Sequence, residues 1–365
     1  MIAYVAPPVT QASKYKAFLK ALSEGGFTGE ISGRYADRVV LATDNSIYQR
    51  LPQAVVFPRS VEDVQLLAKL VDESDYQSIV LTARGGGTGT NGQSLTDGIV
   101  VDLSRHLNRI LWIDPQARKV RVQAGVVKDQ LNAELAKVGL FFAPELSTSN
   151  RATIGGMINT DASGQGSCTY GKTRDHVLSL DVVLLGGERF ESQALSAAGL
   201  QAHMHRPGRI GETYRTAYQV ATTEQALIEK HFPKLNRCLT GYDLAHFWEA
   251  DGRFNLNSIL CGSEGSLGFI VEAELNVLPI PIHTALVNIR YAGFMDALRD
   301  ARALMAHQPL SIETVDSKVL LLAMEDIVWS KVAEFFPEND EGVQTRGINL
   351  VEFCGDDPQD VDARV

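Results

Sequence analysis

One stretch in the first third of the chain ends an apolar run with a loop that contains five glycines. The run covers Ile79 to Thr82, and the loop continues from Arg84 to Gly92 with the sequence Arg-Gly-Gly-Gly-Thr-Gly-Thr-Asn-Gly. Glycine adopts positive φ angles without a steric penalty, so such a loop can turn successive backbone N–H groups to one side. Groups arranged in this way bind anions, and Arg84 adds a positive charge. The stretch therefore predicts a site for a phosphate or a pyrophosphate.

The surroundings of this loop distinguish among the known kinds of phosphate-binding loop. A P-loop is excluded because no Gly-Lys-Ser or Gly-Lys-Thr follows. Residues 87–92 fit the dinucleotide pattern G-x-G-x-x-G, but that pattern requires a helix directly afterwards. Here residues 93–98 are typical of a turn, and Ile99 to Leu103 predicts a strand. The loop is interpreted as the link between two strands, with a plain surface loop as the alternative.

Two later stretches are also rich in glycine and small polar residues. In residues 144–171, small residues would let a flat ligand approach closely; they are Ala152, Gly155, Gly156, Ala162 and Gly164. Polar residues in the same stretch supply hydrogen-bond donors and acceptors; they are Ser147, Thr148, Asn150, Thr153 and Asn159. A long loop inside a compact domain is usually functional. The alternative is a helix-and-turn segment whose glycines serve packing alone. Residues 262–271 read Gly-Ser-Glu-Gly-Ser-Leu-Gly-Phe-Ile-Val.

The remaining sequence predicts an alternation of strands and helices. Helices are expected at 11–24, 61–71, 126–138, 210–231, 295–307 and 317–329, and another begins at Asp356-Asp357-Pro358. Strands are expected at 54–57, 79–82, 99–103, 110–113, 120–124, 180–190 as a hairpin about Gly186-Gly187, 269–278, 285–291, 310–315 and 348–353. In 269–278, Phe269 and every second residue to Val277 are expected on one face. Pro279 and Pro281 mark a domain boundary.

Composition limits the classes of protein and partner. A hydrophobic content of 45% and a charged content of 21% are typical of a soluble globular protein. The net charge of −10 argues against nucleic acid as a partner. The cysteines Cys168, Cys238, Cys261 and Cys354 are far apart, so no zinc site or iron–sulfur ligand set is expected, and reduced thiols indicate a cytoplasmic location. No stretch approaches the roughly 18 apolar residues of a membrane span.

The three glycine stretches, taken in this order, resemble the FAD-binding domain of the vanillyl-alcohol oxidase and p-cresol methylhydroxylase (PCMH) superfamily. Within it the chain is most similar to the large bacterial FAD-linked D-2-hydroxyacid dehydrogenases of the D-2-hydroxyglutarate or D-lactate type, which carry an iron–sulfur region further along. The resemblance implies an α+β protein with a two-subdomain PCMH-type FAD-binding fold and the start of an α/β cap domain. The expected boundaries are a helical lead-in at 1–47, the FAD-binding domain at 48–281 and an incomplete substrate or cap domain at 282–365.

The resemblance also implies which residues bind the cofactor. Those for the pyrophosphate and its surroundings are Arg84, Gly85, Gly86, Gly87, Thr88, Gly89 and Thr90. Those lining the cofactor from the second stretch are Ser147, Thr148, Thr153, Gly155, Gly156, Asn159, Ala162 and Gly164. Glu264, Gly265 and Ile270 are expected beside the adenine half. The first stretch contains no histidine or cysteine for a covalent flavin link, so non-covalent FAD is expected.

The activity implied is oxidation of a D-2-hydroxyacid to the 2-oxoacid by hydride transfer to flavin, with an electron acceptor as second partner and a homo-oligomer as a possible assembly. The catalytic base stays unassigned. The resemblance implies a divalent metal and an iron–sulfur cluster only beyond Val365. The helix beginning at Pro358 is too short to bury a face, so the chain is interpreted as cut there. A metal role for the pair His203 and His205 is not favoured, since a third ligand is missing. A truncated FAD-binding module without turnover and a same-fold oxidase using oxygen remain alternatives.

Overall fold

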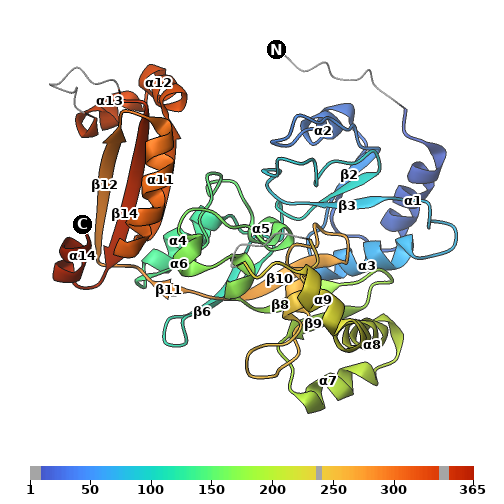
Figure 1. The fold of residues 1–365 in the computed structure, drawn as a ribbon. Helices are drawn as coiled ribbons and strands as arrows, with labels where there is room; N and C mark the ends of the chain where they lie inside the picture. The colour runs from blue at the N-terminus through green and yellow to red at the C-terminus, as the bar shows by residue number, and fades with distance from the viewer. Residues whose placement is uncertain (1–9, 236–240, 337–344) are drawn as a thin grey trace. The chain divides into compact units, whose positions relative to one another are not determined.

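The computed structural model describes residues 10–235, 241–336 and 345–365. The chain forms two compact units. The first unit contains residues 1–162 and 172–278, and the second contains Ser163–Gly171 together with Pro279–Val365. The chain therefore enters the second unit twice. Helices and strands are mixed throughout (Figure 1), as the α+β prediction requires.

The first sheet of the first unit has four strands in the order β1-β2-β4-β3. These are β1 (Glu30–Ser32), β2 (Ala54–Phe57), β4 (Ile99–Asp102) and β3 (Leu81–Arg84). Strands β2, β4 and β3 are parallel, whereas β1 is antiparallel to β2. β2 and β4 are buried along their whole length, which explains why both sequences are continuous apolar runs. The helices of this region are α1 (Ser13–Glu24), α2 (Tyr35–Val40) and α3 (Val61–Val71).

The second sheet of the same unit is antiparallel, with the order β5-β6-β10-β8-β9. Its strands are β5 (Ile110–Asp114), β6 (Lys119–Gln123), β10 (Phe269–Asn276), β8 (Val177–Val183) and β9 (Arg189–Gln193). The predicted hairpin about Gly186-Gly187 joins β8 to β9 and is confirmed. The other elements of the unit are α4 (Lys128–Ala136), β7 (Leu140–Phe141), α5 (Ile154–Thr160), η1 (Thr173–His176), α7 (Ala197–Met204), α8 (Gly208–Thr223), α9 (Gln225–His231), η2 (Leu244–His246) and α10 (Asn257–Leu260). The short strand β11 (Leu278–Pro279) lies at the boundary of the two units.

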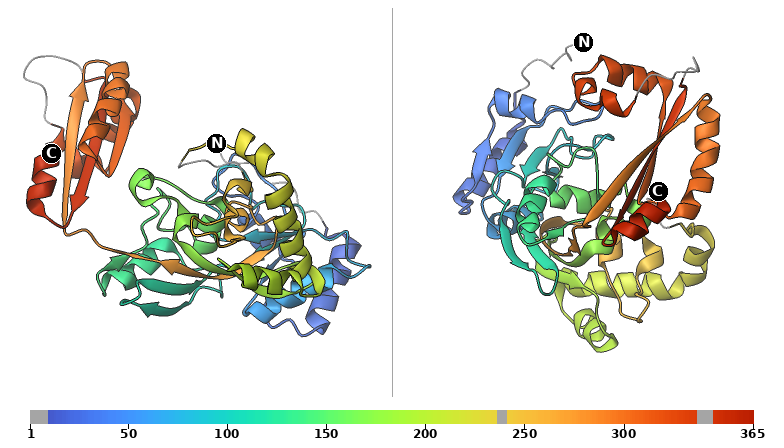
Figure 2. Two further views of the ribbon diagram at one scale, coloured as in Figure 1. Left: turned by 60° about the horizontal axis from the view of Figure 1, so that its bottom comes forward. Right: turned by 90° about the vertical axis from the view of Figure 1, so that its left-hand side faces the viewer.

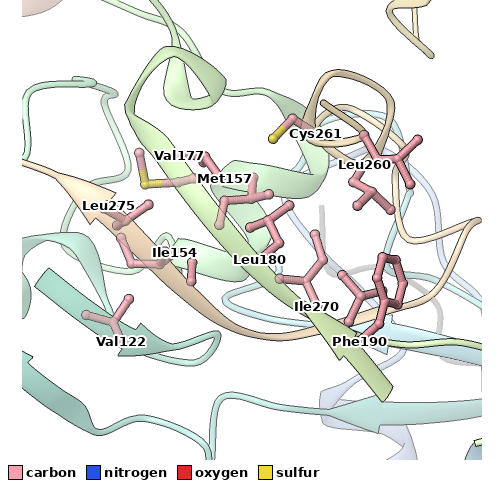
Figure 3. Packing of buried hydrophobic residues seen from close by; sticks show 14 of the residues in the cluster. Val122, Ile154, Met157, Val177, Leu180, Phe190, Leu260, Cys261, Ile270 and Leu275 are labelled. Atoms are coloured by element: carbon pink, nitrogen blue, oxygen red, sulfur yellow. The ribbon is translucent and has the colours of Figure 1, made fainter. Parts of the chain in front are cut away.

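The largest hydrophobic core lies against this second sheet. Figure 3 shows side chains from α5, β6, β8 and β10 gathered there, among them Ile154, Val122, Leu180 and Leu275. A second core joins α1, α3 and the first sheet to Val183 and other residues of the second sheet. The two sheets are thus linked by buried apolar contacts. This packing holds the loops at the ends of their strands in fixed places.

The predicted alternation along β10 is wrong at one point. The pairing of β10 with β8 shifts register between Ile270 and Glu272, as a β-bulge does. As a result Ile270 and Val271 are both buried, but in different cores. Ala273 and Leu275 share the core of Ile270, not that of Val271.

Two other predictions from the sequence need correction. Residues 144–171 are expected to form a loop, but they contain α5 and the short helix α6 (Ser167–Tyr170). Gly155 and Gly156 lie inside α5, whose Ile154 and Met157 are buried. The single helix expected at 210–231 is divided into α8 and α9 at Glu224.

The second unit has a three-stranded antiparallel sheet in the order β12-β14-β13. Its strands are β12 (His283–Tyr291), β14 (Gly347–Gly355) and β13 (Ser311–Asp316), and its helices besides α6 are α11 (Phe294–Leu304), η3 (Met305–His307), α12 (Ser317–Glu325), α13 (Trp329–Val332), η4 (Ala333–Phe335) and α14 (Pro358–Arg364). Figures 1 and 2 show α11 along the strands of this sheet.

The segment 163–171 belongs to the second unit through contacts of its side chains. Gln165 Nε2 donates to Ser311 Oγ at 3.0 Å and to Glu352 Oε2 at 3.1 Å. Tyr170 Oη lies 3.5 Å from Cys354 Sγ. These contacts fasten a segment from the middle of the sequence to the C-terminal sheet.

Helix α14 corrects an expectation about the chain's end. Asp357 caps it by accepting from Gln359 N at 2.9 Å, as the sequence predicts. However, Val361 of this helix is 3% exposed and packs with Val351 and Phe353. A short helix here does bury a face, so the length of α14 is no evidence for where the protein ends.

Candidate cofactor site

The first glycine segment, residues 84–92, follows the carboxyl end of the parallel strand β3. Ligands of open parallel sheets bind at this end of the strands. Gly87 and Gly92 have φ angles of +63° and +79°, which glycine adopts readily. No helix follows directly, because the chain continues through turns and bends to β4. The interpretation as a strand–loop–strand segment is therefore confirmed over the Rossmann alternative.

The first segment packs directly against the second glycine segment, which in the first unit covers residues 147–162. A Cβ atom on Gly85 would collide with Thr153 Oγ1, and one on Gly86 would collide with the carbonyl oxygen of Arg151. Any side chain at either glycine would separate the two segments. The glycines are thus required for close approach as well as for backbone conformation.

Helix α5 fixes the second segment. Thr153 is its N-cap, and its Oγ1 accepts from Gly156 N at 3.3 Å. The backbone N–H groups of Ile154 and Gly155 donate to Val126 O and Ala124 O, each at 2.8 Å. These bonds tie the start of the helix to the segment that follows β6.

The third glycine segment, residues 262–271, is fastened to the end of α5. Glu264 N donates to Asn159 O at 2.8 Å, and Gly265 N donates to Asn159 Oδ1 at 3.0 Å. Asn159 Nδ2 in turn donates to Gly155 O at 2.8 Å. On its other side, Gly265 lies next to Ala83 of β3, since an added Cβ would be 3.8 Å from the Cβ of Ala83. The structure therefore brings all three segments together, and we call them the cradle.

The guanidinium of Arg84 is directed into the protein. The residue is 8% exposed, and its Nη2 donates to Thr43 O at 2.8 Å. Burial lowers the pKa of Arg84, and the carboxylates of Asp102 and Asp44 oppose that shift. The Arg84 side chain thus packs against the loop at Gly87, because a Cβ atom added to Gly87 would collide with Arg84 Nη2. The Arg84 guanidinium is therefore bonded to backbone oxygens of an earlier segment.

The other expected residues are placed as follows. Thr88, Gly89 and Thr90 lie in the partly exposed loop, and Ser147, Thr148 and Ala162 lie in the first unit near α5. Ile270 is 3% exposed in the large core (Figure 3). Gly164 belongs to the second unit, so it is not placed relative to the cradle.

Sequence reasoning missed a buried ion pair next to the cradle. Lys172 Nζ lies 2.7 Å from Asp161 Oδ2, with side chains 1% and 7% exposed. Asp161 ends α5 in the left-handed conformation, with φ of +49°. An added Cβ on Gly262 would be 3.4 Å from the Cβ of Asp161, so the pair supports the third segment. Two charged residues eleven positions apart give no sequence pattern that could have indicated this.

A cavity of about 550 Å³ lies elsewhere in the first unit. Its lining includes Arg174, His246, Trp248, Asn257 and Glu274, and it includes none of the residues predicted to bind the cofactor. This cavity therefore does not coincide with the predicted cofactor residues, which converge in the cradle instead.

The described residues contain no group of three histidine, cysteine or acidic side chains that could hold a metal ion. His203 and His205 bond instead to backbone oxygens within their own helical turn, through Gly199 O and Gln201 O. Of the cysteines, Cys168 is exposed, Cys261 is buried and Cys354 is intermediate, while Cys238 lies outside the described residues. In the part of the chain that the structure describes, no helix is both long and apolar enough to cross a membrane.

Two family descriptions match the chain. The FAD binding domain matches residues 52–192, and the C-terminal domain of FAD linked oxidases matches residues 280–365. The chain belongs to the FAD-linked oxidase family. The cradle fits the cofactor of this family, because Gly85 and Gly86 let the first segment pack closely on the second, at a glycine loop whose backbone N–H groups can bind an anion. FAD is accordingly the cofactor, as the resemblance of the three glycine stretches implies.

Curated proteins with sequences similar to this chain include two D-2-hydroxyglutarate dehydrogenases and a D-lactate dehydrogenase. The D-2-hydroxyglutarate dehydrogenase of Pseudomonas putida is 68% identical over 357 residues, which are 98% of this chain and 35% of that protein. The D-2-hydroxyglutarate dehydrogenase of Escherichia coli is 54% identical over 349 residues, 95% of this chain and 34% of that protein. The mitochondrial D-lactate dehydrogenase [cytochrome] of Arabidopsis thaliana is 28% identical over 291 residues, 79% of this chain and 41% of that protein. The chain thus spans about a third of the D-2-hydroxyglutarate dehydrogenases that it matches.

Solved structures agree on the fold. An alkyldihydroxyacetonephosphate synthase is 19% identical and superposes with a TM-score of 0.68, covering 100% of this chain and 59% of that one. At this identity the likeness concerns the fold alone. It confirms the expected PCMH-type fold class.

Proposed function

We propose that this chain is the FAD-binding portion, with part of the substrate portion, of a dehydrogenase that oxidises D-2-hydroxyglutarate to the 2-oxoacid. The observation that carries this proposal is the 68% identity to a D-2-hydroxyglutarate dehydrogenase over 98% of the chain. D-lactate is the second candidate substrate, supported by the weaker likeness to D-lactate dehydrogenases. The second substrate would be an electron acceptor that reoxidises the flavin.

When bound, FAD supplies the hydride acceptor, and the protein supplies orientation and electrostatics. The backbone of Gly85 to Gly89 is proposed to hold the pyrophosphate, with Arg84 supporting the loop from beneath. The second segment, from Ser147 and Thr148 to Asn159, is proposed to line the rest of the cofactor. Thr153 and Asn159 keep this segment in place through the bonds described above.

We propose that FAD is held without a covalent bond. Covalent attachment needs a histidine or cysteine at the flavin, and residues 84–92 contain neither. Cys261 is buried, which raises the pKa of its thiol and disfavours the nucleophilic thiolate. The second and third segments of the cradle also contain no histidine or cysteine.

The catalytic base, a divalent metal and the iron–sulfur cluster are proposed to belong to sequence beyond these residues. The relatives are about three times as long as the matched region, which supports this placing. It also favours a second candidate function for the isolated chain, namely an FAD-binding module that does not turn over. An oxidase of the same fold that uses oxygen is a further alternative function. We also propose a cytoplasmic location and assembly as a homo-oligomer.

The visible absorption spectrum of the purified 365-residue chain tests the cofactor proposal. A flavin spectrum that passes wholly into the supernatant on denaturation supports non-covalent FAD, and colour that stays with the protein overturns it. Turnover is then assayed with D-2-hydroxyglutarate, D-lactate and an artificial acceptor, beside the full-length P. putida relative. Flavin binding without reduction by either acid supports the module. Failure of the chain to take up FAD refutes the cradle.

A further inference from the structure

A lysine side chain is buried at the start of helix α4. Lys128 is the first residue of this helix and is 1% exposed. It lies in none of the three glycine segments of the cradle. A buried ammonium group is unfavourable unless it is paired and hydrogen-bonded, so the partners of Lys128 indicate what the residue is for.

Two partners of this ammonium group lie in the turn 145–149, where the second glycine segment begins. Lys128 Nζ donates to Glu145 Oε2 and to Ser149 Oγ, the latter at 3.3 Å. The other carboxylate oxygen, Glu145 Oε1, lies 2.6 Å from Ser149 Oγ and accepts from Leu146 N at 3.2 Å. Ser149 N donates to Leu146 O at 3.2 Å, which closes the backbone of the turn. Lys128 therefore joins the first residue of the turn to the last.

The backbone at the start of α4 is bonded to the same segment. Lys128 N donates to Ala152 O at 3.0 Å, and Asp129 N donates to Ser149 O at 3.1 Å. Arg151 and Ala152 are also the residues whose backbone a Cβ atom on Gly86 would meet. Residues 149–152 thus connect the start of α4 to the first glycine segment, so the position of the turn affects the cradle directly.

The polar side chains of the turn differ in burial. Ser149, which contacts Lys128, is 8% exposed, whereas Ser147 is exposed and Thr148 is half-buried. Ser147 and Thr148 are the two residues of the turn that are proposed to line FAD. The side chains that a ligand can reach are therefore at the tip of the turn, and the side chain that fixes the tip is buried with Lys128.

We propose that Lys128 is a positioning residue for FAD, which holds the turn 145–149 in the conformation that presents Ser147 and Thr148 to the cofactor. The proposal rests on the function proposed above, in which the second segment lines FAD. Because Lys128 is buried, it acts through Glu145 and Ser149 and not by contact with the cofactor. Without the ammonium group the turn would adopt several conformations, and binding of FAD would have to order it.

The first test needs no cofactor. Lys128→Met replaces the ammonium group with an apolar side chain that fits a buried place, and Glu145, whose side chain is 47% exposed, can then turn to water. Trypsin cleaves after arginine, and Arg151 is an exposed residue directly after the turn. Cleavage after Arg151 of the apoprotein, followed by the masses of the fragments, is expected to become severalfold faster in the variant, because local opening exposes the backbone. Cleavage after Arg253, exposed elsewhere in the first unit, is the internal control and should keep its rate.

The second test measures the FAD dissociation constant of each apoprotein by quenching of flavin fluorescence. Lys128→Met is expected to raise this constant about tenfold, which corresponds to the loss of one charge-assisted hydrogen bond. Ser149→Ala changes no charge and should also weaken binding; the double variant should bind no more weakly than Lys128→Met alone, because both residues act through one turn. Leu200→Ala is the matched control for stability. Leu200 is 3% exposed in α7, so this variant should lower the Tm and keep the wild-type dissociation constant.

The outcomes separate this proposal from the proposed function. If Lys128→Met binds FAD as tightly as the wild-type chain, or if Leu200→Ala loses as much affinity for the same fall in Tm, the positioning role is refuted while the cradle stands. Unchanged cleavage after Arg151 refutes the claim that Lys128 holds the turn. If the wild-type apoprotein binds no FAD, the cradle itself is refuted and the positioning role is refuted with it. The Tm of each apoprotein confirms that the variants are folded, and Ser149→Ala decides the question if Lys128→Met is not.

Discussion

Gly86 provides the sharpest test of how the first two glycine segments fit together. The Cβ atom of Gly86→Ala would overlap the carbonyl oxygen of Arg151, a backbone atom that no side-chain rotation can move away. Gly86 itself has no positive φ, so the substitution tests space and not backbone conformation. Adding a methyl group to a tightly packed place costs about 1–3 kcal/mol. The expected result is that loop 84–92 moves away from residues 151–153.

Two measurements follow from this magnitude. Urea unfolding of the Gly86→Ala apoprotein is expected to show the decrease in the free energy of unfolding directly. Its Tm should fall by about 2–4 °C for each kcal/mol in a unit of this size. The FAD dissociation constant should rise, because the displaced loop must be returned to the cradle on binding. Each 1.4 kcal/mol of that cost corresponds to a factor of about 10 in the constant.

Gly199→Ala is the matched control. Gly199 lies inside α7, and the contacts of an added Cβ begin at 3.5 Å, an ordinary van der Waals distance. Alanine in a helix is favoured over glycine by about 1 kcal/mol, so this variant should gain stability and keep its FAD affinity. A Gly86→Ala protein with the stability and the affinity of the wild-type chain would refute the reasoning, because the two segments would then not be in contact.

Two further predictions concern ion pairs in the first unit. Lys172→Met leaves the buried Asp161 without the cation that it pairs with, and should lower the free energy of unfolding by about 3–5 kcal/mol, measured in urea. The double variant Lys172→Met with Asp161→Asn should recover part of this stability. Equal losses of stability in the single and the double variant would show that the two residues do not interact. Glu191 has a lowered pKa because its carboxylate accepts from Arg121, so its contribution to stability is present above pH 4.5 and is lost as pH falls through the folded-state value. The stability difference between Glu191→Gln and the wild-type chain should therefore be greatest at neutral pH and shrink as the pH falls below 4.5; a difference that does not shrink in acid would contradict the assignment.

Much of the fold could be predicted because its signals are local. The buried strands at 54–57 and 99–102 are short apolar runs between turn residues, and Ser60 is followed by the helix that it caps with a bond of 3.2 Å from Asp63 N. The glycine loop was identified by composition and by the strand that follows it. In each case the deciding residues are close together in the sequence.

The features that could not be predicted depend on contacts between distant residues. The bulge in β10 moves Val271 to the other core because β8 pairs out of register there, and nothing in the alternation of residues 269–277 signals this. The direction of the Arg84 side chain is set by the carbonyl groups of Leu41 and Thr43. Glu264 has a positive φ of +52°, which no local sequence pattern indicates.

The passage of residues 163–171 into the second unit has a consequence for how the protein can be divided. The boundary at 278–279 looks like a place where the chain could be cut into independent halves. A protein shortened to residue 278 would lose the partners of Gln165 and Tyr170, since Ser311, Glu352 and Cys354 would be gone. Nine residues in the middle of such a fragment, directly after the second glycine segment, would lose these contacts with the C-terminal sheet. Each unit is therefore built from two separate stretches of the chain, and a cut at 278–279 does not divide the protein into its two units.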